Sequence, residues 1–383
     1  MLATRFTPSS TGGLAMTTPN PKLQALTDAG VAVWLDSLKR SYLTGGTLEQ
    51  WRDEYVLHGV TTNPAIFGEA FKSDEYDDQI ASLAADGLDA REIYRTIAAQ
   101  DVRDACDVLR PVYDATGGAD GFVSFEVDPD LARDSDKTIA QAIEYHARVD
   151  RPNLMIKIPG TDEGLPAIEE ALYRGINVNV TLLFSTEAYG KVLEAWLKGL
   201  ERRQAEGLDL AVESVASFFV SRVDSEVDKR LEGKAEEPVL RGKAAIANAR
   251  AAYQLYLEIR QGERFAALEA AGARPQRPLW ASTGVKDPAY TSTKYVDSLI
   301  AAETVNTMPL GTVEATAESG TIVAGTAAID PTADLDAIAA AGIDLGDVTE
   351  LLLSQGISKF EEPMDALLAT IEEKRIAATK ASA

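Results

Sequence analysis

Short apolar runs recur along the chain, and each is followed by a stretch in which apolar residues fall at helical spacing. Runs of this length bounded by turn residues are typical of buried strands, and the spacing after them is typical of amphipathic helices. The pattern therefore predicts eight strands that alternate with helices. The predicted strands are Val31–Leu38, Gly59–Asn63, Gly121–Val127, Asn153–Pro159, Asn177–Phe184, Glu213–Val220, Pro278–Thr283 and Thr304–Pro309.

The predicted helices fill the segments between these strands. Asp89, with Glu92 three positions later, indicates a helix start, and the apolar spacing continues this helix to Leu109. Further helices are predicted at about 135–149, 162–173, 186–206 and, within a long segment between the sixth and seventh strands (224–272), at 243–260. The tail from Pro331 to Lys380 is predicted to consist of helices broken at Gly342, Gly346 and Pro363.

Alternating strands and helices indicate an α/β fold with a parallel sheet. Eight such units favour a (β/α)8 barrel, with additional helices after the sixth strand and at the C-terminus. An open doubly wound sheet is the alternative, but no Gly-x-Gly-x-x-Gly follows the first strand. We expect one barrel domain over residues 22–383. Residues 1–21, which are small and polar, are predicted to be a disordered leader.

The composition of the chain limits the kinds of molecule that it is expected to bind. The 383 residues include 37 Lys and Arg against 60 Asp and Glu, a net charge of −23. Such a charge repels phosphate backbones, so we expect no binding to nucleic acid, and no apolar run is long enough to cross a membrane. One cysteine, Cys106, and two histidines leave no basis for a disulfide or a His/Cys metal site, and a reducing cytoplasm is the expected location.

A lysine interrupts the fourth predicted strand. Side chains alternate between the two faces of a strand, so Lys157 faces away from Ile156 and Ile158, toward the barrel interior. Burial disfavours the charged ammonium, and a neutral amine can attack a carbonyl to form a Schiff base. The alternative is a lysine at a strand end that reaches solvent or pairs with a carboxylate. This strand alone does not separate the two.

Polar residues also stand near the carboxyl ends of the other predicted strands. In a barrel these ends meet at one mouth, where the active site of this fold lies. Asp36 could instead cap the helix that follows it. The candidates are Asp36, Asn63, Glu126, Asn179, Thr181, Ser217 with Phe219, Arg222 just beyond its strand, and Ser282.

A lysine, two acids and several hydroxyl and amide groups suit carbonyl chemistry with proton transfer. Arg222 offers a forked donor for an anion such as phosphate. No metal ligand set and no cofactor signature is evident in the sequence. Carbon–carbon bond cleavage through a protonated imine, without metal or cofactor, fits these residues best.

Five motifs, in the same order along the chain, resemble those of the transaldolase family. They are Gly59-Val-Thr-Thr-Asn-Pro64, Ser124-Phe-Glu-Val127, Met155-Ile-Lys-Ile-Pro-Gly-Thr161, the run from Gly175 to Ser185, and Ser217-Phe-Phe-Val-Ser-Arg222. The resemblance implies a Schiff-base aldolase of the pentose phosphate pathway, built on a (β/α)8 barrel. It implies reversible transfer of dihydroxyacetone from sedoheptulose 7-phosphate to glyceraldehyde 3-phosphate, giving erythrose 4-phosphate and fructose 6-phosphate.

The resemblance also implies a role for each matching residue. Lys157 matches the Schiff-base lysine, Glu126 an acid that works through a water held by Thr181, and Asp36 the acid that takes the C4 hydroxyl proton. Asn63, Asn179 and Ser217 match residues that hold the dihydroxyacetone hydroxyls, Phe219 an aromatic wall and Arg222 a phosphate ligand. At the end of the seventh predicted strand Ser282 is a further candidate, and Lys286, beyond that strand, stands where many members have a second phosphate-binding arginine.

Two alternatives remain open from the sequence. One is a fructose 6-phosphate aldolase that releases free dihydroxyacetone, although those chains are much shorter than this one. The other is an acidic barrel that binds without catalysis, which would leave the inward Lys157 unexplained. The sequence does not distinguish a monomer from a homodimer.

Overall fold

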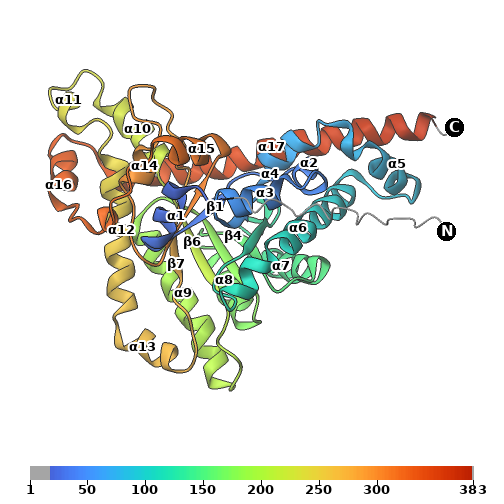
Figure 1. Cartoon of the computed structure of the whole chain (residues 1–383), viewed down its shortest axis with the longest axis horizontal. Helices are drawn as coiled ribbons and strands as arrows, with labels where there is room; N and C mark the ends of the chain where they lie inside the picture. The colour runs from blue at the N-terminus through green and yellow to red at the C-terminus, as the bar shows by residue number, and fades with distance from the viewer. Residues whose placement is uncertain (1–17, 382–383) are drawn as a thin grey trace, which may run out of the picture.

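The protein is described by a computed structural model that covers residues 18–381. Within this range eight parallel strands form a closed barrel in chain order. Figure 1 shows strands in the middle of the molecule with helices around them. Each predicted run overlaps one strand, although β2 and β7 begin before their predicted runs, and the predicted (β/α)8 barrel is confirmed. The strands are β1 Val31–Leu35, β2 Leu57–Thr61, β3 Phe122–Glu126, β4 Leu154–Pro159, β5 Val178–Leu183, β6 Ser214–Phe219, β7 Arg277–Ala281 and β8 Thr304–Met308.

The helices form the outer layer of the barrel and cover parts of its ends. They are α1 Pro21–Asp28, α2 Arg40–Thr44, α3 Thr47–Glu54, α4 Pro64–Ala70, α5 Asp77–Ala85, α6 Ala90–Ala115, α7 Ser135–Val149, α8 Leu165–Tyr173, α9 Thr186–Ala205, α10 Ser221–Leu231, α11 Glu237–Leu240, α12 Ala244–Arg260, α13 Glu263–Ala270, α14 Lys294–Asp297, α15 Leu310–Ser319, α16 Thr332–Ala340 and α17 Leu345–Ala381.

Most of the helices predicted from the sequence are present in the structure. Asp89 caps α6 by accepting a hydrogen bond from the Glu92 N–H at 2.9 Å. α8 starts three residues later than predicted because residues 161–164 form a turn, closed by the Gly164 N–H on the Thr161 carbonyl at 2.9 Å. The long segment after β6 holds α10 to α13, including the predicted helix at 243–260.

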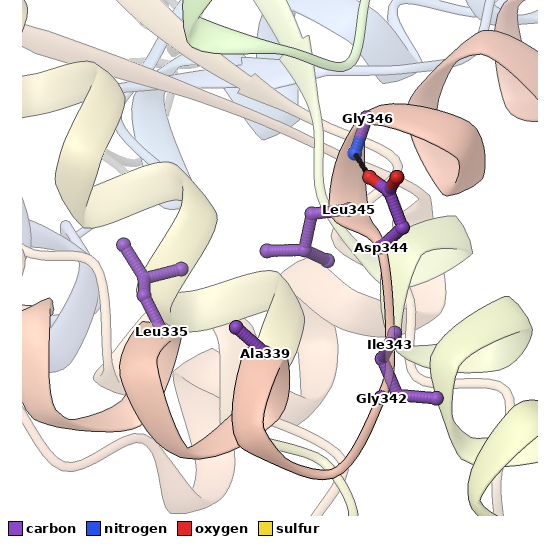
Figure 2. Close-up of a pocket in the computed structure, with 7 residues that line it drawn as sticks. All are labelled: Leu335, Ala339, Gly342, Ile343, Asp344, Leu345 and Gly346. Carbon is purple, nitrogen blue, oxygen red and sulfur yellow. Dashed lines mark hydrogen bonds between the residues drawn. The ribbon is translucent and has the colours of Figure 1, made fainter.

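The C-terminal tail departs from the prediction at two of its three expected breaks. The chain does break at Gly342, whose φ is 77°, and Asp344 then starts α17 by accepting from the Gly346 N–H at 2.8 Å (Figure 2). The predicted breaks at Gly346 and Pro363 are wrong, because α17 runs through both. Glycine is tolerated in a first turn, and the cost of a proline inside a helix is offset by buried apolar packing on one face of α17.

Ion pairs of two buried carboxylates lie at the N-terminal end of the barrel. Asp120 accepts from Trp34 Nε1 at 2.9 Å and from Arg277 Nη1 at 3.0 Å. Glu213, at the start of β6, accepts from Arg274 Nη1 at 2.8 Å. Polar groups at this end of the fold serve stability rather than catalysis.

The start of the described chain belongs to the barrel. Asn20 caps α1 and donates from Nδ2 to the Ala317 carbonyl at 3.2 Å, although it falls within the predicted leader. Residues 1–17 of that predicted leader lie outside the described residues. No helix among residues 18–381 is long and apolar enough to cross a membrane.

Candidate active site

A cavity of about 170 Å³ opens at the carboxyl end of the barrel strands. It brings together side chains from β2, β4, β5, β6 and β8, from the segments just after β1, β2 and β7, and from α10 and α17. Every site residue predicted from the sequence lines it except Glu126 and Asn179, which lie immediately behind its wall. The predicted residues on the wall are Asp36, Asn63, Lys157, Thr181, Ser217, Phe219, Arg222, Ser282 and Lys286.

Lys157 forms a buried ion pair with Glu126. The two residues are direct neighbours across β3 and β4, each is only 5% exposed, and Lys157 Nζ lies 3.1 Å from Glu126 Oε2. Nζ also donates to the Thr62 carbonyl at 3.1 Å. Burial raises the pKa of Glu126, the nearby charge of Asp36 raises it further, and Lys157 opposes both. The result is an amine with a proton-exchanging carboxyl group at hydrogen-bond distance.

A chain of hydrogen bonds lies beside this pair inside the barrel. Ser217 Oγ donates to Asn179 Oδ1 at 2.7 Å, and Asn179 Nδ2 donates to Ser124 Oγ at 3.0 Å. Asn179 is fully buried and pairs with Lys157 across β4 and β5. Asn179 therefore orients the residues of the wall, whereas Ser217 reaches the cavity itself.

Two polar groups on the cavity wall have unused hydrogen-bonding capacity. Within residues 18–381, the buried Thr181 Oγ1 and Arg222 Nη1 find no hydrogen-bond partner. Thr181 lies where β5 shifts register, next to Leu182 with a φ of 62°, and such strained backbone is common at functional sites. Buried polar groups normally have partners, so both atoms point to a bound ligand or water.

The Arg222 guanidinium lies 5.1 Å above the centre of the Phe219 ring. Burial lowers the pKa of this arginine, and the charge of Asp36 partly opposes the shift. A desolvated, forked cation on the wall of a cavity is a strong site for an anionic group of a ligand.

Asp36 is not a helix cap. α2 begins at Arg40 after Lys39, while Asp36 Oδ1 accepts a hydrogen bond from Thr61 Oγ1 at 2.7 Å. The Thr61 hydroxyl is in turn 2.7 Å from Thr307 Oγ1 on β8. β1 is three strands from β4 in the barrel order, so Asp36 reaches the cavity from a strand that is not adjacent to the strand of Lys157.

The remaining predicted residues sit at the rim. Asn63 caps α4 by accepting from the Ile66 N–H at 3.0 Å while its side chain lines the cavity. Ser282, with a φ of 55°, has its Oγ 2.9 Å from Ser221 Oγ at the start of α10. This contact ties the loop that carries Lys286 to the helix that carries Arg222.

Besides Ala281, Gly284 and Pro309, three residues of the cavity wall were not predicted from the sequence. Thr61 and Thr307 line it, and both were visible as inward positions of alternating strands. Phe360, on α17, also lines it, with Lys157 Nζ 5.5 Å from the centre of its ring. No local pattern indicated Phe360, because its position depends on how α17 packs. Among the described residues, no group of three or more His, Cys, Asp or Glu is placed to hold a metal ion.

Known proteins resemble this chain over nearly its whole length. A family model described as Transaldolase/Fructose-6-phosphate aldolase matches residues 33–371. The chain belongs to this family. It is 51% identical over 363 residues to a transaldolase of Saccharopolyspora erythraea, with 93% of this chain and 98% of the relative covered. It is 53% identical to transaldolase 2 of Streptomyces coelicolor, covering 94% and 99%, and 53% identical to a transaldolase of Thermobifida fusca, covering 93% and 99%. The resemblance seen in the sequence motifs is confirmed.

Proposed function

We propose that the protein is a transaldolase that moves a dihydroxyacetone unit from a ketose phosphate to an aldose phosphate through a Schiff base on Lys157. The observation that carries the proposal is the buried Lys157, 3.1 Å from Glu126, inside a cavity that also contains Arg222. The donors are sedoheptulose 7-phosphate and fructose 6-phosphate, and the acceptors are glyceraldehyde 3-phosphate and erythrose 4-phosphate. A reducing cytoplasm, expected from cysteine usage, is where such substrates occur.

In the first half of the cycle Lys157 attacks the donor carbonyl. Glu126 supplies and removes protons during loss of water from the carbinolamine, through a water bound by the unpartnered Thr181 hydroxyl. The iminium ion then draws electrons from the bond between the third and fourth sugar carbons. Asp36 takes the proton from the C4 hydroxyl. The bond between the third and fourth carbons then breaks, and the aldose phosphate leaves.

In the second half the three-carbon enamine on Lys157 attacks the new aldehyde, and the same groups act in reverse. Arg222 binds the phosphate of donor and acceptor with its unused Nη1. Lys286, on the same wall, adds a second positive charge. A lysine lacks the fork of a guanidinium, so we assign Lys286 the weaker share of phosphate binding.

Release of free dihydroxyacetone, the aldolase alternative, uses the same lysine and the same imine. The relatives that cover nearly the whole chain are named transaldolases, which favours transfer. An assay with fructose 6-phosphate, with and without erythrose 4-phosphate, distinguishes the two: turnover that requires the acceptor indicates transfer.

The test of the proposal is borohydride trapping with fructose 6-phosphate, followed by peptide mapping. We expect the reduced adduct on Lys157, and we expect Lys157→Ala to lose transfer while keeping the folded state. Lys191, an exposed lysine paired with Asp162 at 2.9 Å, provides the control, because Lys191→Ala leaves both trapping and turnover intact. An adduct on another lysine refutes the assignment of the Schiff base to Lys157, and the absence of any adduct favours a barrel that binds without catalysis.

A further inference from the structure

The C-terminal helix α17 lies across the mouth of the barrel. Figure 1 shows it running from the side of α14 and α15 to that of α5. It contacts α10 near its start, through Asp347 and Arg230, and then α4, α5 and α6. Lys374, near its end, pairs with Asp77 at 2.6 Å. The face of α17 turned to the barrel is buried, and its residues are Leu352, Ile357, Phe360, Met364, Leu367 and Ile371.

Close packing of this helix on β5 brings Phe360 to the site. A Cβ at Gly356 would lie 3.1 Å from Leu182 Cδ2, a tight contact, so glycine allows α17 to approach the end of β5 closely. Phe360 is four residues further on and therefore on the same face of the helix. Its ring is 7% exposed, lines the cavity and lies over Lys157 Nζ.

We infer that Phe360 is a specificity-determining residue that keeps bulk solvent from the three-carbon unit bound to Lys157, and so favours transfer to an aldose over release of free dihydroxyacetone. The inference rests on the proposed function. The ring covers the nitrogen at which every intermediate is attached, and its face also favours the positive charge of an iminium ion. Arg222 lines the same cavity, and its Nη1 has no hydrogen-bond partner among the described residues, so it is available to an acceptor phosphate.

The reaction that Phe360 suppresses is a hydrolysis that needs no reactant besides water. The terminal carbon of the enamine takes a proton from solvent, which gives the iminium ion of dihydroxyacetone. Water then adds to the iminium carbon and loses a proton, and the carbon–nitrogen bond breaks. Free dihydroxyacetone and the amine of Lys157 result, with one water consumed for each enamine. Excluding bulk solvent from the enamine carbon slows its protonation, the step that only release needs, whereas hydration of every imine uses the water bound by Thr181.

The experiment measures two products from fructose 6-phosphate and erythrose 4-phosphate: sedoheptulose 7-phosphate from transfer, and free dihydroxyacetone from hydrolysis. We expect Phe360→Ala to raise the ratio of release to transfer by about tenfold or more, and Phe360→Leu to raise it less. Leu367→Ala is the matched control, because Leu367 is 1% exposed on the same face of α17 and packs near Gly68 on α4, outside the cavity. It loosens the helix without opening the site.

The outcomes separate the inference from its premise. A wild-type ratio in both Phe360 variants overturns the inference, and so does an equal rise in Leu367→Ala, since general loosening of α17 would then be the cause. If Phe360→Ala does not fold, Phe360→Leu decides by the same criterion. Wild-type protein that forms a borohydride adduct but transfers nothing refutes the proposed function instead.

Discussion

At the scale of single residues, the unusual feature is a lysine buried inside a barrel of apolar strands. Burying an ammonium group costs several kcal/mol unless other groups compensate it. Here Glu126, the Thr62 carbonyl and the Phe360 ring surround Lys157 Nζ. Removing one partner therefore affects both the charge state of the site and the position of the amine, which makes the acids the most informative residues to change.

Variants that lack one of the two acids should be impaired at different steps of the reaction. Because Glu126 contacts Lys157 and Asp36 contacts Thr61, Glu126→Gln should slow formation of the borohydride-trappable imine. Asp36→Asn should still form the imine with fructose 6-phosphate but should not release glyceraldehyde 3-phosphate. Trapping rates and product release, measured on the same samples, check this. Normal trapping in Glu126→Gln with none in Asp36→Asn would mean that the roles are exchanged.

Arg222 should contribute to binding of the phosphate. A hydrogen bond to a charged group contributes roughly 1.5–3 kcal/mol, so Arg222→Ala should raise KM for glyceraldehyde 3-phosphate about 10- to 150-fold. KM for unphosphorylated glyceraldehyde should stay near that of the wild type, which separates lost phosphate binding from a damaged site. For Arg222→Lys, KM for glyceraldehyde 3-phosphate should lie between that of the wild type and that of Arg222→Ala, because lysine keeps the charge but lacks the forked guanidinium. Equal effects on both acceptors would rule out a phosphate role.

At the scale of elements, each end of the barrel has a separate task. The carboxyl ends of the strands carry the cavity, and the shift of register in β5 sets the direction of Thr181. The amino ends carry ion pairs that involve Asp120, Glu213 and two arginines. Since these carboxylates are almost fully buried, they link stability to pH.

Glu213 should make the wild type less stable as the pH rises. Burial raises its pKa from 4.5 to about 7, although Arg274 and Arg277 oppose the shift. The folded state thus holds the Glu213 proton more tightly than the unfolded state does. The contribution of this proton to the free energy of unfolding therefore falls as the pH rises from about 4.5 to 7. Relative to Glu213→Gln, the wild type should lose about 2 kcal/mol of unfolding free energy between pH 5 and pH 8.

Urea unfolding of both proteins at the two pH values measures this difference. Glu258→Gln, which changes an exposed carboxylate on α12, is the control and should follow the wild type at both pH values. If the wild type and Glu213→Gln differ in unfolding free energy by the same amount at both pH values, Glu213 has the same pKa in the folded and unfolded states.

At the scale of the whole molecule, the net charge of −23 is the dominant electrostatic fact. Local ion pairs such as Arg264 with Glu194 and Glu201 relieve part of the repulsion, but exposed pairs contribute little each. The remaining negative charges repel over the Debye length, which is about 30 Å at 0.01 M salt and 10 Å at 0.1 M. Folding holds these charges closer together than the unfolded chain does.

Screening should therefore stabilise the folded state. The unfolding temperature should rise by a few degrees between about 0.01 and 0.3 M sodium chloride, because long-range repulsion weakens more than short-range pairs do. Chloride is preferred to sulfate, which strengthens burial of apolar surface by itself. A fall in the unfolding temperature over this range would show that ion pairs outweigh the net repulsion.

The sequence by itself determined the strands and most of the site. Strand side chains alternate with a strict period of two, so Lys157, Glu126 and Thr181 could be assigned to the barrel interior from their neighbours alone. Parallel order then places the ends of all strands at one mouth. These inferences need only local spacing and one rule of topology, which is why they were correct.

Only the tertiary structure decided what covers that mouth and what lies behind its wall. Phe360 is about 200 positions from Lys157, and its place depends on the glycine contact at Gly356 and on burial of α17 against α4 to α6. The same burial carries α17 through Pro363, against local propensity. Asn179 faces inward as predicted, but hydrogen bonds to Ser217 and Ser124 hold it behind the cavity. In each case contacts between distant segments outweigh the local preference, and no local pattern in the sequence records them.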